Sequence, residues 1–252
     1  MTSFSVMPPR RRNSYVTAGL VCVGLGIAGG GALLLYGSLR SAGAVAAGYG
    51  VRNGGVELTG KELDSAILRL AALPRRDADE EGALTFLDYA AADRAARRRD
   101  VARWHRELLA TRQAARRTLS LSPTRADISL VLAEVEYLLH APREAVEAPL
   151  ELSFAAAPRE LWIVKRRIGL GLRLVPDASP RLRNLIESDV RLLGEPFRSL
   201  DNYWVLAQAA QRAGPVAIAL VRQILARGHP WPFQFFNQDL ARLSARQPAA
   251  TH

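Results

Sequence analysis

The four histidines are the first candidates for metal binding or acid–base chemistry. They are His105, His140, His229 and His252. No two of them have the H-x-x-x-H spacing that places two imidazoles on one helix face, and the chain has a single cysteine, Cys22. His105 lies two residues from Glu107, and residues two apart on a helix do not share a face. We therefore expect no metal site and no cofactor, and structural roles for the histidines.

Paired carboxylates could supply general acid–base chemistry of the kind that glycosidases use. They occur at residues 79–81, where we expect a loop, and at Glu134 and Glu136, where we expect a solvated helix face. The chain has no G-x-S-x-G nucleophile motif and no phosphate-binding loop. We interpret the protein as a non-enzyme. The alternative from another class is an all-α periplasmic enzyme that acts on glycans through carboxylates scattered over its helices.

Glycines gather in the N-terminal part of the chain, and residues 24–29 match the dinucleotide-binding motif G-x-G-x-x-G. That fold also needs alternating strands and helices and an acid about 20 residues farther on. The first acid of the chain is Glu57, which lies beyond that distance, and no strand pattern follows. Gly26 and Gly30 also form G-x-x-x-G, which lets two transmembrane helices approach closely. We therefore predict helix packing through Gly26 and Gly30, with homo-oligomerisation through this segment left open.

Two runs of residues could bind a partner. They are the basic run Lys165, Arg166 and Arg167, and the aromatic run Trp231, Phe233, Phe235 and Phe236. The basic run could dock an anionic partner or a phosphorylated lipid head group, or it could be a rim of cations whose apolar stems cover a buried helix. The aromatic run could cap the core, or it could form an exposed patch that meets a membrane protein. Both runs remain candidate partner-binding residues.

The element that carries the glycines is an uncharged segment over residues 16–36. A helix of this length spans roughly 30 Å, the thickness of a bilayer core. Arginines at 10–12 precede the segment and Arg40 follows it, so the excess of positive charge favours a cytoplasmic N-terminus. We predict a transmembrane helix over 16–36 in a bacterial inner membrane, after a cytoplasmic tail over 1–15. Cleavage as a signal peptide near Ala44-Val45-Ala46 is the alternative.

The charge of the chain does not indicate a nucleic-acid partner. Its net charge of +10 comes from 34 basic and 24 acidic residues, and 49% of its 252 residues are apolar, enough for a core. Residues 1–56 hold five arginines and no acid, so half of the surplus belongs to the membrane segment and its flanks. Beyond it we predict a flexible tether over 37–58, a periplasmic α-helical domain over 59–246 and a disordered tail over 247–252.

Helix signals recur through the predicted domain, whereas no strand pattern does. Thr59 and Glu62 have the spacing of a capping box. The Ser-Pro pairs at 122–123 and 179–180 combine an N-cap with proline in the first turn, which predicts two further helix starts. The fold class is therefore predicted to be all-α.

Prolines also repeat with the period of a helical-hairpin repeat. Pro123, Pro158, Pro196 and Pro230 follow one another at intervals of about 34 to 38 residues. In the unit that ends at Pro158, the sequence resembles the tetratricopeptide repeat family. The residues that carry this resemblance are Leu130, Ala133, Tyr137, Leu150 and Pro158. Glu134, Val146 and Pro149 depart from the pattern. The resemblance implies an α-solenoid whose concave face binds a peptide or a partner protein.

A second resemblance rests on residues 122–174 and on SDVRLL at 188–193. These stretches are similar to single-span, periplasm-facing helical-repeat proteins of bacterial exopolysaccharide and O-antigen assembly. This implies a membrane-anchored scaffold that docks envelope or inner-membrane proteins in polysaccharide biosynthesis or export. The remaining alternative is a structural subunit of a larger membrane complex, packed through its glycine-rich span.

Overall fold

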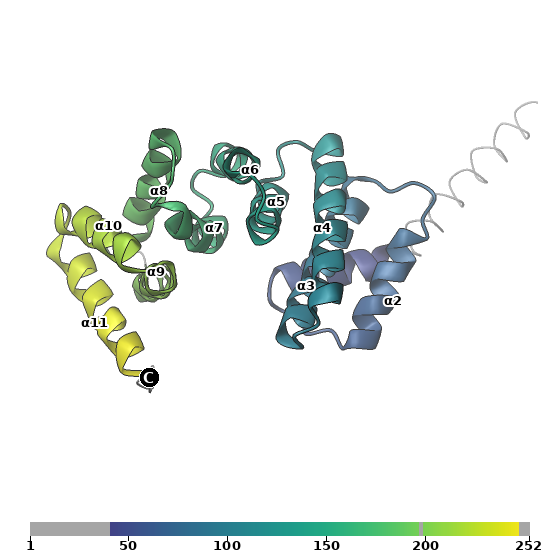
Figure 1. Cartoon of the computed structure of the whole chain (residues 1–252), viewed down its shortest axis with the longest axis horizontal. Coiled ribbons are helices and arrows are strands. Elements are labelled where there is room, and N and C mark those ends of the chain that lie inside the picture. The colour runs from purple at the N-terminus through teal and green to yellow at the C-terminus, as the bar shows by residue number, and fades with distance from the viewer. Residues whose placement is uncertain (1–40, 197–198, 247–252) are drawn as a thin grey trace, which may run out of the picture.

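A computed structural model describes residues 41–196 and 199–246, and the part of the chain that it describes is all-α, with no strand (Figure 1). Residues 41–52 are helical and are followed by α2 to α11. The bounds are α2 (Gly60–Ala71), α3 (Ala78–Arg97), α4 (Val101–Leu121), α5 (Ala126–Leu138), α6 (Arg143–Ala156), α7 (Leu161–Leu174), α8 (Pro180–Leu193), α9 (Leu200–Ala213), α10 (Pro215–Ala226) and α11 (Pro230–Arg246). The predicted fold class is confirmed at this level.

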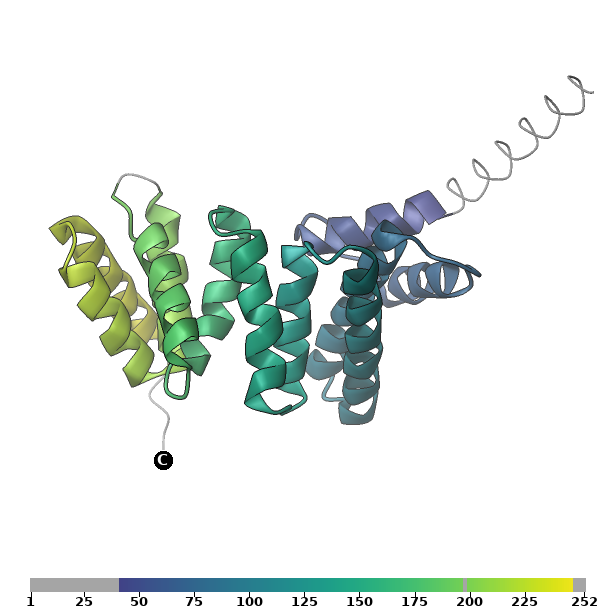
Figure 2. The same cartoon turned by 90° about the horizontal axis from the view of Figure 1, so that it is seen from above.

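The helices form hairpins that follow one another along the long axis of the molecule (Figure 2). The helices α5 and α6, α7 and α8, and α9 and α10 pair within hairpins. In addition, α7 contacts α5 and α9, α9 contacts α11, and α8 contacts α6 and α10. The odd-numbered helices therefore form one row and the even-numbered helices another, with a continuous apolar core between them.

Side-chain caps explain where several helices begin. The Thr59 hydroxyl accepts from the Glu62 amide at 3.4 Å and the Glu62 carboxylate accepts from the Thr59 amide at 2.7 Å, which confirms the capping box. Ser179 caps α8, as predicted, with Pro180 in the first turn. The other Ser-Pro pair was assigned wrongly, because Ser122 ends α4 and α5 begins only at Ala126.

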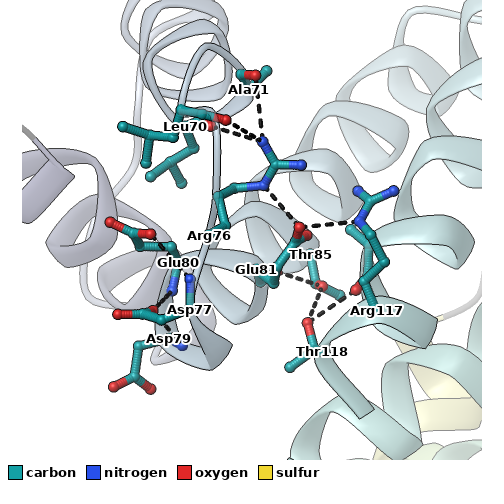
Figure 3. Close-up of polar contacts among 12 residues, drawn as sticks. Leu70, Ala71, Arg76, Asp77, Asp79, Glu80, Glu81, Thr85, Arg117 and Thr118 are labelled. Carbon is teal, nitrogen blue, oxygen red and sulfur yellow. Dashed lines mark hydrogen bonds and ion pairs between the residues drawn. The ribbon is translucent and has the colours of Figure 1, made fainter. Parts of the chain in front are cut away.

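The carboxylates at 79–81 lie in a helix and not in the expected loop. Asp77 begins α3 by accepting hydrogen bonds from the amides of Asp79 and Glu80 at 2.9 and 2.8 Å. Glu80 in turn accepts from the Asp77 amide at 3.1 Å (Figure 3). These acids stabilise the positive end of the helix dipole. Their clustering therefore has a local structural cause.

The expected tether is largely a packed helix. Residues 41–52 are helical, and Ala44 is buried in a core cluster shared with α2 and α3. A side chain at Gly48 would place its Cβ 2.8 Å from the Cα of Ala83, closer than real contacts allow. The small residues that indicated flexibility therefore serve close helix packing.

Several predictions concern residues outside the described ranges. These are the cytoplasmic tail over 1–15, the transmembrane helix over 16–36 with Gly26 and Gly30, and the tail over 247–252. Among the helices of residues 41–196 and 199–246, none has both the length and the apolar character needed to cross a membrane.

A buried polar network joins α2, α3 and α4. The carboxylate of Glu81 accepts from Nε of Arg76 at 2.8 Å and from Nε of Arg117 at 3.0 Å (Figure 3). Nη1 of Arg76 also donates to the carbonyl oxygens of Leu70 and Ala71, at 3.1 and 3.3 Å, at the C-terminal end of α2. One arginine thus satisfies free carbonyls of one helix and a buried acid of the next.

Asp88 lies two turns farther along α3 and is also buried. Burial raises the pKa of its carboxyl most, the negative charges of Glu107 and Glu81 also raise it, and Arg117 and Arg76 lower it, so that the pKa is about 7. The protonated form is therefore favoured in the folded protein, because an ionised carboxylate there is poorly solvated.

This pKa predicts that folding stability falls as pH rises through about 7. The pKa of Asp88 is higher in the folded chain than its ordinary value of 3.8. Its contribution to the free energy of unfolding is therefore complete below about pH 4 and is lost progressively as the pH rises to about 7. The loss approaches about 1.4 kcal/mol per pH unit in that window. Asp88→Asn should flatten the dependence in denaturant unfolding at pH 5 and pH 8, whereas Asp93→Asn on the exposed face of α3 should not. An unchanged slope in Asp88→Asn would contradict this assignment.

Candidate partner-binding groove

Helices α9 and α11 lie at one end of the molecule and pack against each other (Figure 1). Ser199 caps α9 by accepting a hydrogen bond from the Asp201 amide at 3.3 Å. Pro230 occupies the first turn of α11, where its missing amide hydrogen has no cost. The Trp231 amide donates to Nδ1 of His229 at 3.4 Å, and the His229 ring lies edge-on to the Trp231 ring.

The aromatic run is divided between the two roles considered for it. Phe236 is 0% exposed in the core, and Phe233 is half-buried against that core. Trp231 is 48% and Phe235 is 36% exposed, on the opposite face of the same helix. Residues four apart lie on one face of a helix, so Trp231 and Phe235 form one surface.

Trp231 and Phe235 line a groove of about 500 Å³ together with residues of α9. The Tyr203 ring stacks on the Phe235 ring with centroids 5.7 Å apart and an interplanar angle of 9°. Leu200 lies at the edge of the groove and is 65% exposed. We call this surface, lined by Pro196, Ser199, Leu200, Tyr203, Trp231, Gln234 and Phe235, the α9–α11 groove.

The composition of the α9–α11 groove favours binding over reaction. No carboxylate, histidine or cation is among its lining residues, and the hydroxyl of Ser199 is engaged in the helix cap. Partial burial raises the pKa of Tyr203, so its hydroxyl remains a neutral donor. Exposed aromatic side chains gain free energy when a partner removes them from water. The groove therefore suits an apolar, uncharged surface.

The basic run does not form one surface. Lys165 is half-buried, and Arg166 is paired with Glu134 of α5 at 3.0 Å and lies over the Tyr89 ring. Arg167 is completely buried in the core of the stacked hairpins. An anionic partner therefore cannot contact all three cations together.

Arg167 has a structural environment that satisfies its charge. Its guanidinium forms two hydrogen bonds with Asp189 of α8, at 2.6 and 2.7 Å. Nη1 also donates to the carbonyl oxygens of Ser153 and Ala157, at 3.1 and 2.8 Å, at the end of α6. The guanidinium lies over the Phe154 ring, 4.1 Å from its centroid. One side chain on α7 thereby links α6 and α8.

Within residues 41–196 and 199–246, no three His, Cys, Asp or Glu side chains lie close enough together to hold a metal ion. No protein-family model, no curated protein and no solved structure matches the chain. Evidence on function therefore comes from the geometry of the molecule itself. Of the residues that carry the tetratricopeptide resemblance, Leu130, Ala133 and Leu150 are buried in the core.

The division of the aromatic run predicts that two neighbouring substitutions destabilise the protein by different amounts. Phe236→Ala should lower the free energy of unfolding by about 3–5 kcal/mol, because it leaves a cavity in the core. Phe235→Ala should lower it by about 1 kcal/mol or less, because its ring loses only partial contacts. Denaturant unfolding followed by circular dichroism measures both. Equal effects would show that Phe235 belongs to the core.

The basic run gives a second matched pair of substitutions. Arg167→Met should destabilise the protein by about 3–5 kcal/mol, because it leaves Asp189 buried without its partner. Lys165→Met, two residues away, should change stability by less than about 0.5 kcal/mol. Thermal unfolding of the two variants distinguishes a structural arginine from a surface cation. A negligible effect of Arg167→Met would contradict the buried pair.

Proposed function

We propose that the protein is a membrane-anchored, non-enzymatic scaffold that docks another envelope protein through the α9–α11 groove. The observation that carries this proposal is the exposure of Leu200, Trp231 and Phe235 around a groove without charged lining residues. Trp and Tyr side chains in such pockets supply much of the binding energy of protein interfaces. The occupant is an apolar segment of the partner protein.

The arrangement of the hairpins supports a scaffold. Two rows of stacked helices resemble the tetratricopeptide type of solenoid, in which each hairpin contacts only its neighbours and the array presents an extended surface. Stacked hairpins of this kind need no catalytic centre to act, because the surface itself is the functional element. Polysaccharide biosynthesis or export is the pathway that the second sequence resemblance favours.

Anchoring would increase the encounter rate with a membrane partner. A span over 16–36 would leave only residues 37–40 before the helix at 41–52, which packs against α2 and α3. The periplasmic domain would then be held close to the bilayer by a short connection. Helices α9 and α11, whose residues line the groove, lie at the opposite end of the molecule from this helix (Figure 1). Confinement of both proteins to one layer raises their effective concentration.

Site-specific crosslinking tests the docking role. A photoreactive residue in place of Gln234, inside the groove, should crosslink to an envelope protein in intact membranes, and one in place of Val216 on the exposed face of α10 should not. With that protein purified, Trp231→Ser and Phe235→Ser should each weaken binding at least tenfold, because each removes an apolar contact, and Val216→Ser should leave the affinity unchanged. Equal crosslinking at both positions, or equal affinities, would refute the proposal.

The two alternatives predict different results. If the protein is a structural subunit packed through its span, Gly26→Leu and Gly30→Leu should abolish assembly while groove variants have no effect. If it is an enzyme of envelope glycans, paired carboxylates in a cleft should be required for activity, and the α9–α11 groove has none.

A further inference from the structure

A cleft of about 330 Å³ lies between the helix at 41–52 and α2. The residues that line it include Gly43, Ala47, Leu58, Lys61, Ser65 and Arg69. Both helices belong to the N-terminal core cluster, and α2 lies at the opposite end of the molecule from α11 (Figure 1). The cleft is therefore separate from the α9–α11 groove, and we call it the α2 cleft.

One wall of the α2 cleft carries two cations and a hydroxyl group. Lys61, Ser65 and Arg69 follow one another at intervals of four residues along α2, so they lie on one face of that helix. Lys61 and Arg69 are exposed, and neither forms an ion pair with an acid among residues 41–196 and 199–246. Their Cα atoms are roughly 12 Å apart along the helix axis, with Ser65 midway between them. An anion held at Ser65 is therefore within reach of both long side chains.

The charge balance of the α2 cleft favours an anionic ligand. The acid in its lining is Glu62, whose carboxylate accepts a hydrogen bond from the Thr59 amide at 2.7 Å in the capping box. This acid is thus engaged at the start of α2 and forms no ion pair with Lys61 or Arg69. Two cations against one acid leave the cleft with a positive charge, which attracts anions.

The other wall of the α2 cleft is apolar and open. Ala47 and Leu58 contribute to it, and a Cβ atom added at Gly43 would meet no other atom within 4 Å. Apolar surface that a ligand removes from water contributes to the free energy of binding. A cleft with cations on one wall and apolar groups on the other therefore matches an amphiphilic anion, which joins a charged group to a hydrocarbon chain.

The position of the α2 cleft in the chain indicates which amphiphilic anion is available. Gly43 follows Tyr36, the last residue of the proposed span, by seven residues. Seven residues cover roughly 10 Å in a helix and at most about 25 Å when extended. If residues 16–36 cross the bilayer, the cleft would lie near the head-group layer, where phospholipid phosphates are abundant anions.

We propose that the α2 cleft binds the head group of an anionic phospholipid. Lys61 and Arg69 donate to the phosphate oxygens, and the glycerol and the first part of the acyl chains lie against Ala47 and Leu58. This inference rests on the anchoring of the proposed function but not on docking at the α9–α11 groove. The bound lipid would hold the domain to the membrane at a second point beside the span, which fixes the orientation of the stacked hairpins.

Native mass spectrometry of the full-length protein in a non-ionic detergent tests the proposal. The probes are phosphatidylglycerol and phosphatidylcholine with the same acyl chains. One phosphatidylglycerol should bind, at least fivefold more tightly than phosphatidylcholine. Lys61→Gln and Arg69→Gln should each weaken its binding about fivefold, because each removes one cation from the phosphate. Arg106→Gln is the matched control, since it removes an exposed cation of α4 outside the cleft, and it should leave the affinity unchanged.

A second pair of variants tests the space in the α2 cleft without changing its charge. Gly43→Leu places a side chain at the mouth of the cleft, where its Cβ meets no other atom, so it should weaken phosphatidylglycerol binding at least fivefold. Gly169→Leu on α7 is the control, because a Cβ there also meets no atom within 4 Å, and it should bind the lipid as the wild type does. Circular dichroism establishes that each variant is folded.

The outcomes separate the lipid site from the proposed function. Equal affinities for the two lipids, or an equal loss in Arg106→Gln, would overturn the lipid site. Binding of inorganic phosphate as tight as that of the lipid would also overturn it, because the apolar wall would then contribute nothing. Alkaline extraction of membranes tests the anchor separately. Release of the full-length protein would refute the anchored scaffold, whereas retention without lipid selectivity would refute the α2 cleft alone.

Discussion

A single helical hairpin cannot bury its apolar face by itself, and the architecture follows from this constraint. Each hairpin from α5 to α10 covers the next, so one core cluster extends from α5 to α11. The array has no further hairpin after α11 among the described residues 41–196 and 199–246. One face of α11 packs into the core through Phe236 and Leu240, while Trp231 and Phe235 lie on another face, where the Phe235 ring stacks on Tyr203 of α9. Trp231 and Phe235 form the candidate binding groove together with residues of α9.

Polar side chains hold the hairpins in register where apolar packing alone is not specific. Arg76 and Arg117 converge on buried Glu81 in the N-terminal helices, and Arg167 pairs with Asp189 among the stacked hairpins. A buried charge is tolerated only when its partners lie at hydrogen-bonding distance, so each network permits few relative positions of the helices it joins. Some arginines of the chain therefore stabilise the packing of helices, in addition to those that lie on the solvated surface.

Much of the local structure could be predicted because it depends on neighbours in the chain. The caps at Thr59 and Ser179 are examples, since a hydroxyl reaches an amide three residues away wherever the helix lies. The prediction of a flexible tether was wrong over residues 41–52, because glycine and alanine favour both flexible linkers and closely packed helices. Only the presence of Ala83 beside Gly48 decides between the two.

The sequence by itself determined the all-α class, two capped helix starts and the aromatic and basic runs, because these depend on composition and short-range spacing. Only the tertiary structure decided which residues of the aromatic and basic runs are buried and which are exposed. Arg167 is buried because Asp189, 22 residues away, lies on a neighbouring helix. Arg52, Arg125 and Trp162 share a pocket because helices distant in the chain meet there. Such contacts depend on how whole helices pack, and no pattern within one helix specifies its neighbour.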